Sequence, residues 1–490
     1  MIYVRLIGHN FQYEVYELIK VFYFGEEIFF LEDLNQYNEG LLILSRLIET
    51  NEGLKASTEI YKDNSLVSKE FIIDIDRIDV DKSSTNKKIR IGIKQSIYDA
   101  LSNLSNIKAP WGILTGVRPV KIVHNLLDEN KSQDEIIHTL TNEYRLDLDK
   151  AKLIMDIGKK QREYLYPLDE DNFSIYISIP FCPTRCLYCS FPSLNINSYI
   201  HWVEEYVDRL IYEMERIKDL MGKRNVSTVY IGGGTPSAIP NKQLDRIIKA
   251  VYKNFDKESI EEFTVEAGRP DTIDGELLKM LNENQIDRIS INPQTMNDNT
   301  LKIIGRKHSS KDIINTYYQA RQIGFDVINM DLIVGLPSEG IEEIKNTLDS
   351  IRELKPENLT VHTLAVKRGS KFINAMDKYK VADQNTIEAM IEQTQIFANE
   401  MELFPYYLYR QKQMMGNFEN VGYAMEGKEC VYNIKMMEEK ETVIGLGMGA
   451  VSKIYFPKED RIERIPNVKS LEEYLKRVDE MVNRKADALS

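Results

Sequence analysis

Three of the four cysteines in the chain stand close together, at Cys182, Cys186 and Cys189, in the spacing C-x3-C-x2-C. Three thiolates at such positions can hold three irons of a cubane iron–sulfur cluster and leave the fourth iron without a protein ligand. A cluster that only transfers electrons usually has all four irons held by the protein, whereas an open iron can bind a substrate or a cofactor. The spacing therefore predicts a [4Fe–4S] cluster that binds a small molecule.

Other uses of these cysteines fit the sequence less well. Zinc takes four ligands at tetrahedral geometry, usually supplied as two short-spaced pairs. No second pair follows here, because His201 is the only nearby histidine and Cys430 stands alone. Four cysteines in 490 residues are too few for a disulfide framework, and such sparse cysteine is typical of a reducing compartment.

The composition excludes several classes of protein. The formal net charge is −13, without a basic tail, which argues against a nucleic-acid partner. The first residues lack the basic-then-apolar pattern of a secretion signal, and the chain has no run of about eighteen apolar residues that would span a membrane. With 43% hydrophobic residues the chain can form several domains. We therefore expect a cytoplasmic protein without a membrane span.

From about residue 174 the sequence repeats a pattern of strand, loop and amphipathic helix. The expected strands are 175–179, 228–231, 262–266, 288–291, 327–334 and 359–363. Six such units predict an α/β fold, a partial (β/α)6 barrel in which helices cover the outer face of a parallel sheet. Barrel-type folds of this kind place their chemistry at the carboxyl ends of the strands.

Three parts are expected along the chain. Residues 1–165 predict an N-terminal α+β extension, in which Ser132-x-x-Glu135 has the form of a capping box that begins a helix. Residues 166–365 contain the barrel pattern. Residues 366–490 mix aromatic, basic and glycine-rich segments and are expected to form a C-terminal domain that covers the substrate.

Residues suited to cofactor binding follow the predicted strands. The run 232–236, GGGTP, lets the backbone approach a ligand closely and exposes its N–H and C=O groups. The carboxylates of Glu266 and Asp331 could hold ribose hydroxyls. Each feature alone is more often a turn, a helix cap or a surface ion-pair partner, but their shared placement at strand ends favours one site.

These motifs together resemble a known family. The spacing C-x3-C-x2-C, the run GGGTP and the segment 331–337, DLIVGLP, occur in the order found in radical S-adenosylmethionine (SAM) proteins of the oxygen-independent coproporphyrinogen III dehydrogenase family. Within it the chain most resembles the HemZ-type branch, which carries a long N-terminal extension. The resemblance covers about 174 to 455 and implies a radical SAM core. Its cofactors are a [4Fe–4S] cluster and SAM, and the resemblance does not decide whether a second SAM molecule binds.

The resemblance also implies roles for individual residues. The three cysteines would ligate the cluster as its metal ligands, and Tyr176, Glu266 and Arg306 would belong to the catalytic site. The positions that match cofactor contacts of the family are Tyr176, Tyr188, Gly233, Gly234, Thr235, Glu266, Gln294, Arg306, Asp331, Ala365 and Val451. Some of these positions serve the second SAM molecule in the family.

The implied reaction is an oxygen-independent oxidative decarboxylation. A 5′-deoxyadenosyl radical would abstract a hydrogen from a propionate of coproporphyrinogen III, and loss of CO2 and one electron would leave a vinyl group. Two such events give protoporphyrinogen IX in haem biosynthesis. The implied partners are this tetrapyrrole substrate and a low-potential electron donor such as flavodoxin or ferredoxin.

Two departures from the family keep other functions open. Phe191 stands where the dehydrogenase usually has a fourth cysteine, and Ser178 replaces the histidine of its YxHxPFC motif. The alternatives are a haem-binding chaperone of the same family, or a radical SAM enzyme that acts on haem by methyl transfer or ring opening. For the chaperone, His308 and His362 are candidate haem ligands, although local hydrogen bonding is the commoner role, and Cys430 is expected to be a buried thiol.

A tetracarboxylate substrate needs cations and a flat surface. The basic groups that could bind its carboxylates are Lys367, Arg368, Arg410, Lys412 and Lys453. The tyrosines Tyr406, Tyr407 and Tyr409 could stack on the tetrapyrrole, or could belong to a core.

Overall fold

The chain divides into two units, Met1–Gly158 and Lys159–Ser490, which are each compact. The computed structural model describes residues 1–23, 25–37, 39–51, 53–75, 82–365, 367, 369–374, 378–411 and 418–489. The sequence predicted three parts with boundaries near 165 and 366. The structure instead places the C-terminal residues in the same unit as the barrel strands. Among the described residues, no helix combines the length and the apolar character needed to cross a membrane.

The first unit is a five-stranded sheet with helices. Its strands lie in the order β2-β1-β3-β4-β5, with β1 parallel to both neighbours and β3, β4 and β5 joined as antiparallel hairpins. The strands are β1 (Ile2–Ile7), β2 (Ile28–Phe30), β3 (Leu41–Thr50), β4 (Gly53–Lys62) and β5 (Ser65–Ile75). The helices that begin in this unit are α1 (Gln12–Phe22), α2 (Lys82–Ser105), α3 (Val120–Asp128), α4 (Gln133–Asn142) and α5 (Leu148–Leu165). The predicted capping box at Ser132 and Glu135 is confirmed, because both reciprocal hydrogen bonds are present at the start of α4.

The second unit is built on an eleven-stranded sheet whose central six strands are parallel. The order is β14-β15-β13-β12-β11-β10-β9-β6-β16-β17-β18. These six strands are β6 (Asn172–Ile179), β9 (Asn225–Gly233), β10 (Glu262–Gly268), β11 (Arg288–Ile291), β12 (Val327–Val334) and β13 (Asn358–Thr363). Each of the six predicted strands is therefore present, and the predicted partial barrel is confirmed.

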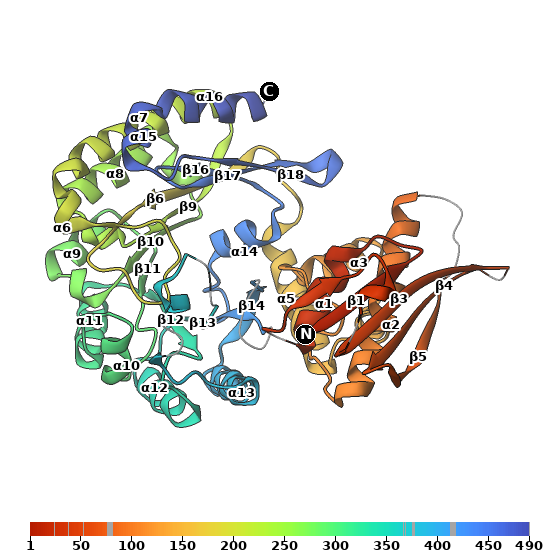
Figure 1. Cartoon of the computed structure of the whole chain (residues 1–490). Helices are drawn as coiled ribbons and strands as arrows, with labels where there is room; N and C mark the ends of the chain where they lie inside the picture. Colours follow the sequence, from red (N-terminus) through yellow and green to blue (C-terminus); the bar gives the residue numbers. More distant parts are fainter. Residues whose placement is uncertain are drawn as a thin grey trace. The chain divides into compact units, whose positions relative to one another are not determined.

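Helices cover the outer side of these strands, as Figure 1 shows for the second unit. They are α7 (Val203–Met221), α8 (Asn241–Asn254), α9 (Gly275–Glu283), α10 (Asp298–Ile303), α11 (Ser310–Ile323) and α12 (Ile341–Leu354). In α7 the apolar residues Val203, Val207, Leu210 and Met214 recur at helical spacing, and all four are buried. Burial of this face holds the helix on the sheet.

The C-terminal strands extend both edges of the same sheet. On one edge β15 (Asn420–Ala424) pairs antiparallel with β13, and β14 (Phe404–Tyr409) pairs with β15. On the other edge β16 (Thr442–Leu446) lies parallel to β6, followed by β17 (Val451–Phe456) and β18 (Arg461–Pro466). The remaining elements are β7 (Phe181–Cys182), β8 (Leu194–Asn195), α6 (Ile196–Tyr199), α13 (Gln384–Glu400), α14 (Val431–Glu438), α15 (Leu471–Lys476) and α16 (Val478–Leu489). Because these strands share the barrel's hydrogen-bond ladder, residues after 366 do not form a separate compact unit.

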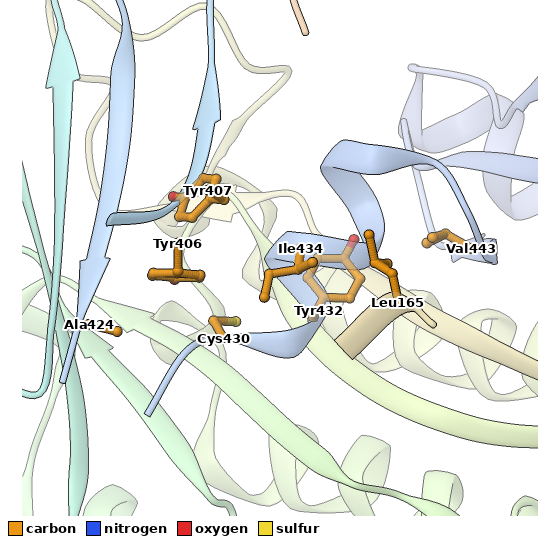
Figure 2. Packing of buried hydrophobic residues seen from close by; sticks show 8 residues of the cluster. All are labelled: Leu165, Tyr406, Tyr407, Ala424, Cys430, Tyr432, Ile434 and Val443. Carbon is orange, nitrogen blue, oxygen red and sulfur yellow. The ribbon is translucent and has the colours of Figure 1, made fainter. Parts of the chain in front are cut away.

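A buried cluster joins the C-terminal segments to the barrel (Figure 2). It contains Leu165, Tyr406, Tyr407, Ala424, Cys430, Tyr432, Ile434 and Val443. Cys430 is 2% exposed, which confirms the predicted buried thiol, and its Sγ donates to Oε1 of Glu262 at 3.2 Å. Tyr406 is a core residue of this cluster, so it is not available to stack on a ligand.

Candidate functional site

The cysteine loop follows β6 and is held by two other strand-end segments. The backbone N–H of Leu187 donates to the carbonyl of Ile304, and that of Phe372 donates to the carbonyl of Leu187, both at 3.0 Å. Ile304 lies beyond β11, and Phe372 lies beyond β13. The fold therefore fixes the loop between the carboxyl ends of strands that are far apart in sequence.

The three cysteines line one cavity of about 340 Å³. Within the described residues, no set of three His, Cys, Asp or Glu side chains is gathered as ligands of one metal ion would be. A cubane cluster instead spreads its thiolate ligands over separate corners. Burial raises the pKa of Cys182 and of Cys189, and the Cys186 thiol raises it further in both cases. Bound iron would offset this cost by stabilising the thiolates, so the donor set fits a cluster.

The glycine run after β9 lies directly against the cysteine loop. The backbone N–H of Gly234 donates to the carbonyl of Ile179, and that of Thr235 to the carbonyl of Phe181, both at 2.8 Å. A Cβ atom on Gly234 would stand 3.0 Å from Sγ of Cys182 and 2.7 Å from the carbonyl oxygen of Phe181. The glycine is therefore required for the close approach of the two loops.

Most residues predicted from the family motifs meet in this cavity. The lining includes Tyr188, Gly233, Gly234, Thr235, Glu266, Gln294, Arg306, Asp331 and Ala365. Tyr176 and Val451 are not among the lining residues. Tyr176 is stacked with Tyr230 and Tyr432, each with ring centroids 6.3 Å away, and Val451 is 37% exposed at the start of β17.

The charged residues that line the cavity are the carboxylates Glu266 and Asp331 and the cations Arg185, Arg269, Arg306 and Lys367. Burial raises the pKa of Glu266 to about 8, and the nearby carboxylate of Asp331 adds to the rise. The Arg306 guanidinium is buried and donates to the carbonyl of Asn292 at 2.5 Å and to the hydroxyl of Tyr188 at 3.3 Å. Burial alone would lower the pKa of Arg306, but Tyr188 and a cysteine thiol keep it raised. These groups can hold hydroxyl, amine and carboxylate groups of a cofactor.

Of the described cations predicted for substrate carboxylates, Lys367 alone lines the cavity. Burial lowers the pKa of Lys367, while the neighbouring Cys189 raises it. Arg410 is buried at 2% exposure and is not part of the lining, and Lys453 is paired with Glu439 at 2.9 Å. The other two predicted cations, Arg368 and Lys412, lie outside the described residues.

Aromatic residues form a second wall of the cavity. Tyr407 and Tyr409 both line it and stack at 6.3 Å with an angle of 8° between their rings. His362 also lines it, and its Nδ1 lies 3.1 Å from the Tyr409 hydroxyl. His308 is buried, and its Nδ1 lies 3.2 Å from Oδ1 of Asp271, so both histidines make the local hydrogen bonds expected of them.

Some cavity residues were not predicted from the sequence. Tyr230, Asn329, Thr360 and Asn433 line it in addition to the predicted set. The first three lie on β9, β12 and β13, where the alternation of a strand directs every second side chain to the same face. This alternation could have identified Tyr230 from the sequence, because Tyr230 lies on the same strand directly before Ile231 and the glycine run. Asn433 lies on α14, and only the folded chain brings it to the site.

Comparison with known proteins supports this description. The model of the radical SAM superfamily matches residues 176–351. The chain is 40% identical over 412 residues to the oxygen-independent coproporphyrinogen-III oxidase-like protein HemZ of Bacillus subtilis (strain 168), covering 83% of this chain and 82% of HemZ. It is 33% identical over 278 residues to the heme chaperone HemW of the same organism, covering 56% of this chain and 70% of HemW. The structure of coproporphyrinogen III oxidase (HemN) from Escherichia coli, a radical SAM enzyme, is similar with a TM-score of 0.53 and 24% identity, covering 66% of this chain and 73% of that one.

A parallel sheet with a three-cysteine loop at its carboxyl edge and a cavity beside it defines a radical SAM protein. The cofactors of this class are a [4Fe–4S] cluster and SAM, in agreement with the prediction from the motifs. The chain belongs to the family of oxygen-independent coproporphyrinogen-III oxidase-like proteins that includes HemZ.

Proposed function

We propose that the chain catalyses the oxygen-independent oxidative decarboxylation of coproporphyrinogen III propionates to vinyl groups, giving protoporphyrinogen IX in haem biosynthesis. The observation that carries the proposal is the presence of Lys367 in the same cavity as the three cysteines. A cation placed beside the site of hydrogen abstraction can bind the carboxylate of the reacting propionate. Similarity to HemZ over most of both chains supports the same class of substrate.

The chain's own residues would prepare the site for chemistry that the cofactors supply. The bound cluster and SAM supply the one-electron hydrogen abstraction that begins the reaction. The three cysteines would hold the cluster, and Glu266 and Asp331 would accept hydrogen bonds from ribose hydroxyls of SAM. Tyr176, which is partly buried and stacks on the cavity residue Tyr230, would act by packing against Tyr230 rather than by direct contact.

Substrate binding would use the remaining walls of the cavity. The stacked rings of Tyr407 and Tyr409 offer a flat apolar surface for a tetrapyrrole. Lys367 would orient one propionate toward the cluster side of the cavity, since it lines the same cavity as Cys189. A walled site of this kind excludes water from a reactive radical. We place the activity in the cytoplasm, because an iron–sulfur cluster and free cysteine thiols need a reducing compartment.

The proposal is tested anaerobically with the reconstituted protein, dithionite, SAM and coproporphyrinogen III. Mass spectrometry should show successive losses of CO2 plus two hydrogens from the tetrapyrrole. The matched control is Cys186→Ala, which should yield neither 5′-deoxyadenosine nor product. Cleavage of SAM by the unmodified chain while the tetrapyrrole stays intact would show that the substrate assignment is wrong.

One observation favours a haem-binding function as the second candidate. His362 lines the cavity, and the chain is similar to a heme chaperone over part of its length. A haem-binding chain should show a tight haem complex whose absorbance spectrum changes in His362→Ala. The exposed His138 supplies the control variant His138→Ala, which should leave the spectrum unchanged. Equal haem spectra in all three proteins would rule out His362 as a ligand.

A further inference from the structure

Arg269 lines the cavity beside the cysteines, although the sequence motifs did not identify it as a site residue. It directly follows β10, and its side chain is only 4% exposed. Its Nη1 donates to the Thr184 hydroxyl at 2.8 Å and to the Thr184 carbonyl at 3.3 Å. Because Thr184 lies between Cys182 and Cys186, Arg269 holds the cysteine loop between two of its three cysteines.

Asp271 holds the guanidinium of Arg269 from the other side. Nε and Nη2 of Arg269 donate to Oδ1 and Oδ2 of Asp271 at 2.9 and 2.8 Å, which makes a bidentate ion pair. Nδ1 of His308 lies 3.2 Å from Oδ1 of the same carboxylate. Burial alone would raise the pKa of Asp271, but hydrogen bonds from His308 and Arg269 hold it well below its usual range. Asp271 is therefore ionised at neutral pH and fixes the planar guanidinium in one orientation.

The Thr184 hydroxyl extends this network to a third segment. It accepts from Arg269 and donates to the carbonyl of Gly305 at 3.0 Å. Gly305 and His308 belong to the segment after α10, so this segment contacts both the cysteine loop and Asp271. Burial lowers the pKa of His308, so its ring is neutral at pH 7. The charges of the network are therefore one cation and one anion.

The charge of Arg269 lies nearer to the cysteine loop than the charge of Asp271. Nη1 faces Thr184 while Nε and Nη2 face the carboxylate, so the guanidinium stands between the two. Burial raises the pKa of the Cys182 thiol, whereas the charge of Arg269 lowers it. Arg269 therefore stabilises negative charge at this edge of the cavity. An electron that enters a cluster adds one negative charge, so a nearby cation favours the reduced state.

We propose that Arg269 is a positioning residue for the bound cluster, which fixes Thr184 between two cysteines and raises the reduction potential of the cluster through its charge. Asp271 acts through Arg269, because it orients the guanidinium and partly offsets the charge. The inference rests on the radical SAM class and does not depend on which tetrapyrrole is the substrate.

The test measures the cluster itself, in the full chain after anaerobic reconstitution and without SAM or tetrapyrrole. A redox titration followed by electron paramagnetic resonance gives the midpoint potential. The rate at which a chelator removes iron reports how firmly the loop holds the cluster. Arg269→Gln removes the cation, and Asp271→Asn removes the anion that offsets it. The two variants break the same ion pair but change the local charge in opposite directions.

We expect Arg269→Gln to lower the midpoint potential and Asp271→Asn to raise it. Loss of the ion pair as a merely structural contact would shift both potentials in the same direction. Arg269→Lys keeps the charge but not the bidentate geometry, so its potential should lie closer to that of the unmodified chain than the potential of Arg269→Gln does. The chelator should remove iron from both Arg269 variants on the order of ten-fold faster than from the unmodified chain.

Arg246 supplies the control, because its guanidinium pairs with Asp208 at 2.5 Å on α8, one of the helices on the outer side of the sheet (Figure 1). Arg246→Gln should leave the potential and the release of iron unchanged. Shifts of the same sign in Arg269→Gln and Asp271→Asn, or equal effects in the control, would overturn the proposal. If Arg269→Gln holds too little cluster to titrate, a potential in Asp271→Asn that is not above that of the unmodified chain overturns it as well. Unchanged release of iron from both Arg269 variants would show that Arg269 does not position the loop.

Discussion

The Lys485 ammonium lies 2.7 Å from the Glu213 carboxylate, and neither side chain is exposed to solvent. Glu213 also accepts hydrogen bonds from the backbone N–H of Gly447 at 2.8 Å and from the Tyr474 hydroxyl at 2.7 Å. The ion pair thus connects the last helix, α16, with α7 and with the glycine-rich turn after β16. It stabilises a turn that lies beside the first strand of the barrel.

A short chain of hydrogen bonds continues from this turn to β6. The backbone N–H of Met448 donates to the Tyr206 hydroxyl at 3.1 Å, and the Ser178 hydroxyl donates to the carbonyl of Met448 at 3.0 Å. Ser178 stands four residues before Cys182. Ser178, in place of the family's histidine, therefore helps to position the strand that leads into the cysteine loop.

Replacing Lys485 by Met should lower the free energy of unfolding by about 3–5 kcal/mol, because Glu213 is left as an unpaired buried charge. Urea unfolding of the full chain measures this loss. The double variant Lys485→Met/Glu213→Gln removes both charges, so its free energy of unfolding should fall by less than that of the single variant. Lys476→Met, at an exposed position of α15, is the control and should change stability little. A single variant as stable as this control would contradict the prediction.

Replacing Gly234 by Ala should reduce the amount of cluster that the chain holds. The added Cβ would stand 3.0 Å from Sγ of Cys182, so the cysteine loop must shift to relieve the contact. Iron per chain and the visible absorbance after reconstitution measure the effect. Gly116→Ala is the matched change, because a Cβ there meets no atom within 4 Å. Full iron content in the Gly234 variant would show that the loop tolerates the displacement.

The stability of the metal-free chain should fall as pH rises toward 8, because of Glu266. Burial, followed by the Asp331 carboxylate, raises the pKa of Glu266 from 4.5 to about 8 in the folded chain. Between these values the folded chain holds a proton that the unfolded chain has released, so the contribution of Glu266 to stability is fully present below pH 4.5 and is lost as the pH approaches 8. The slope should be on the order of 1.4 kcal/mol per pH unit.

Glu266→Gln should remove most of this slope, because the amide does not titrate in that range. Urea unfolding at a series of pH values measures this slope. The control is Glu276→Gln, because Glu276 is exposed. A slope that is identical in Glu266→Gln and in the unmodified chain would show that another group is responsible.

Replacing Lys367 by Met should raise the KM for coproporphyrinogen III by about ten-fold, because the cavity loses a cation that binds a carboxylate. Cleavage of SAM without tetrapyrrole should remain near the level of the unmodified chain, since Lys367 is not expected to hold the cofactor. Lys367→Arg keeps the charge and should recover most of the affinity. Steady-state kinetics with dithionite checks this, and an unchanged KM in Lys367→Met would remove Lys367 from the substrate site.

The sequence by itself determined the features that depend on local chemistry. The spacing of Cys182, Cys186 and Cys189 indicated a cluster, since three ligands on one short loop need no distant partner. The capping box at Ser132 and Glu135 was predictable for the same reason, because both hydrogen bonds lie within one helical turn. The six barrel strands were predictable because each is an apolar run followed by a loop and an amphipathic helix.

Only the tertiary structure decided which distant residues meet. Residues 366–490 were expected to form a C-terminal domain that covers the substrate, but the pairing of their strands with β13 and β6 makes those strands part of the barrel sheet. Lys453 was predicted to bind the substrate, but in the fold its ammonium lies 2.9 Å from the Glu439 carboxylate. Lys367, in contrast, lines the cavity. Tyr176, a predicted cofactor contact, is partly buried and stacks with Tyr432 against the buried cluster, and its role stays a prediction. Sheet pairing, charge neutralisation and aromatic packing depend on contacts between different elements of the folded chain, which local sequence patterns do not specify.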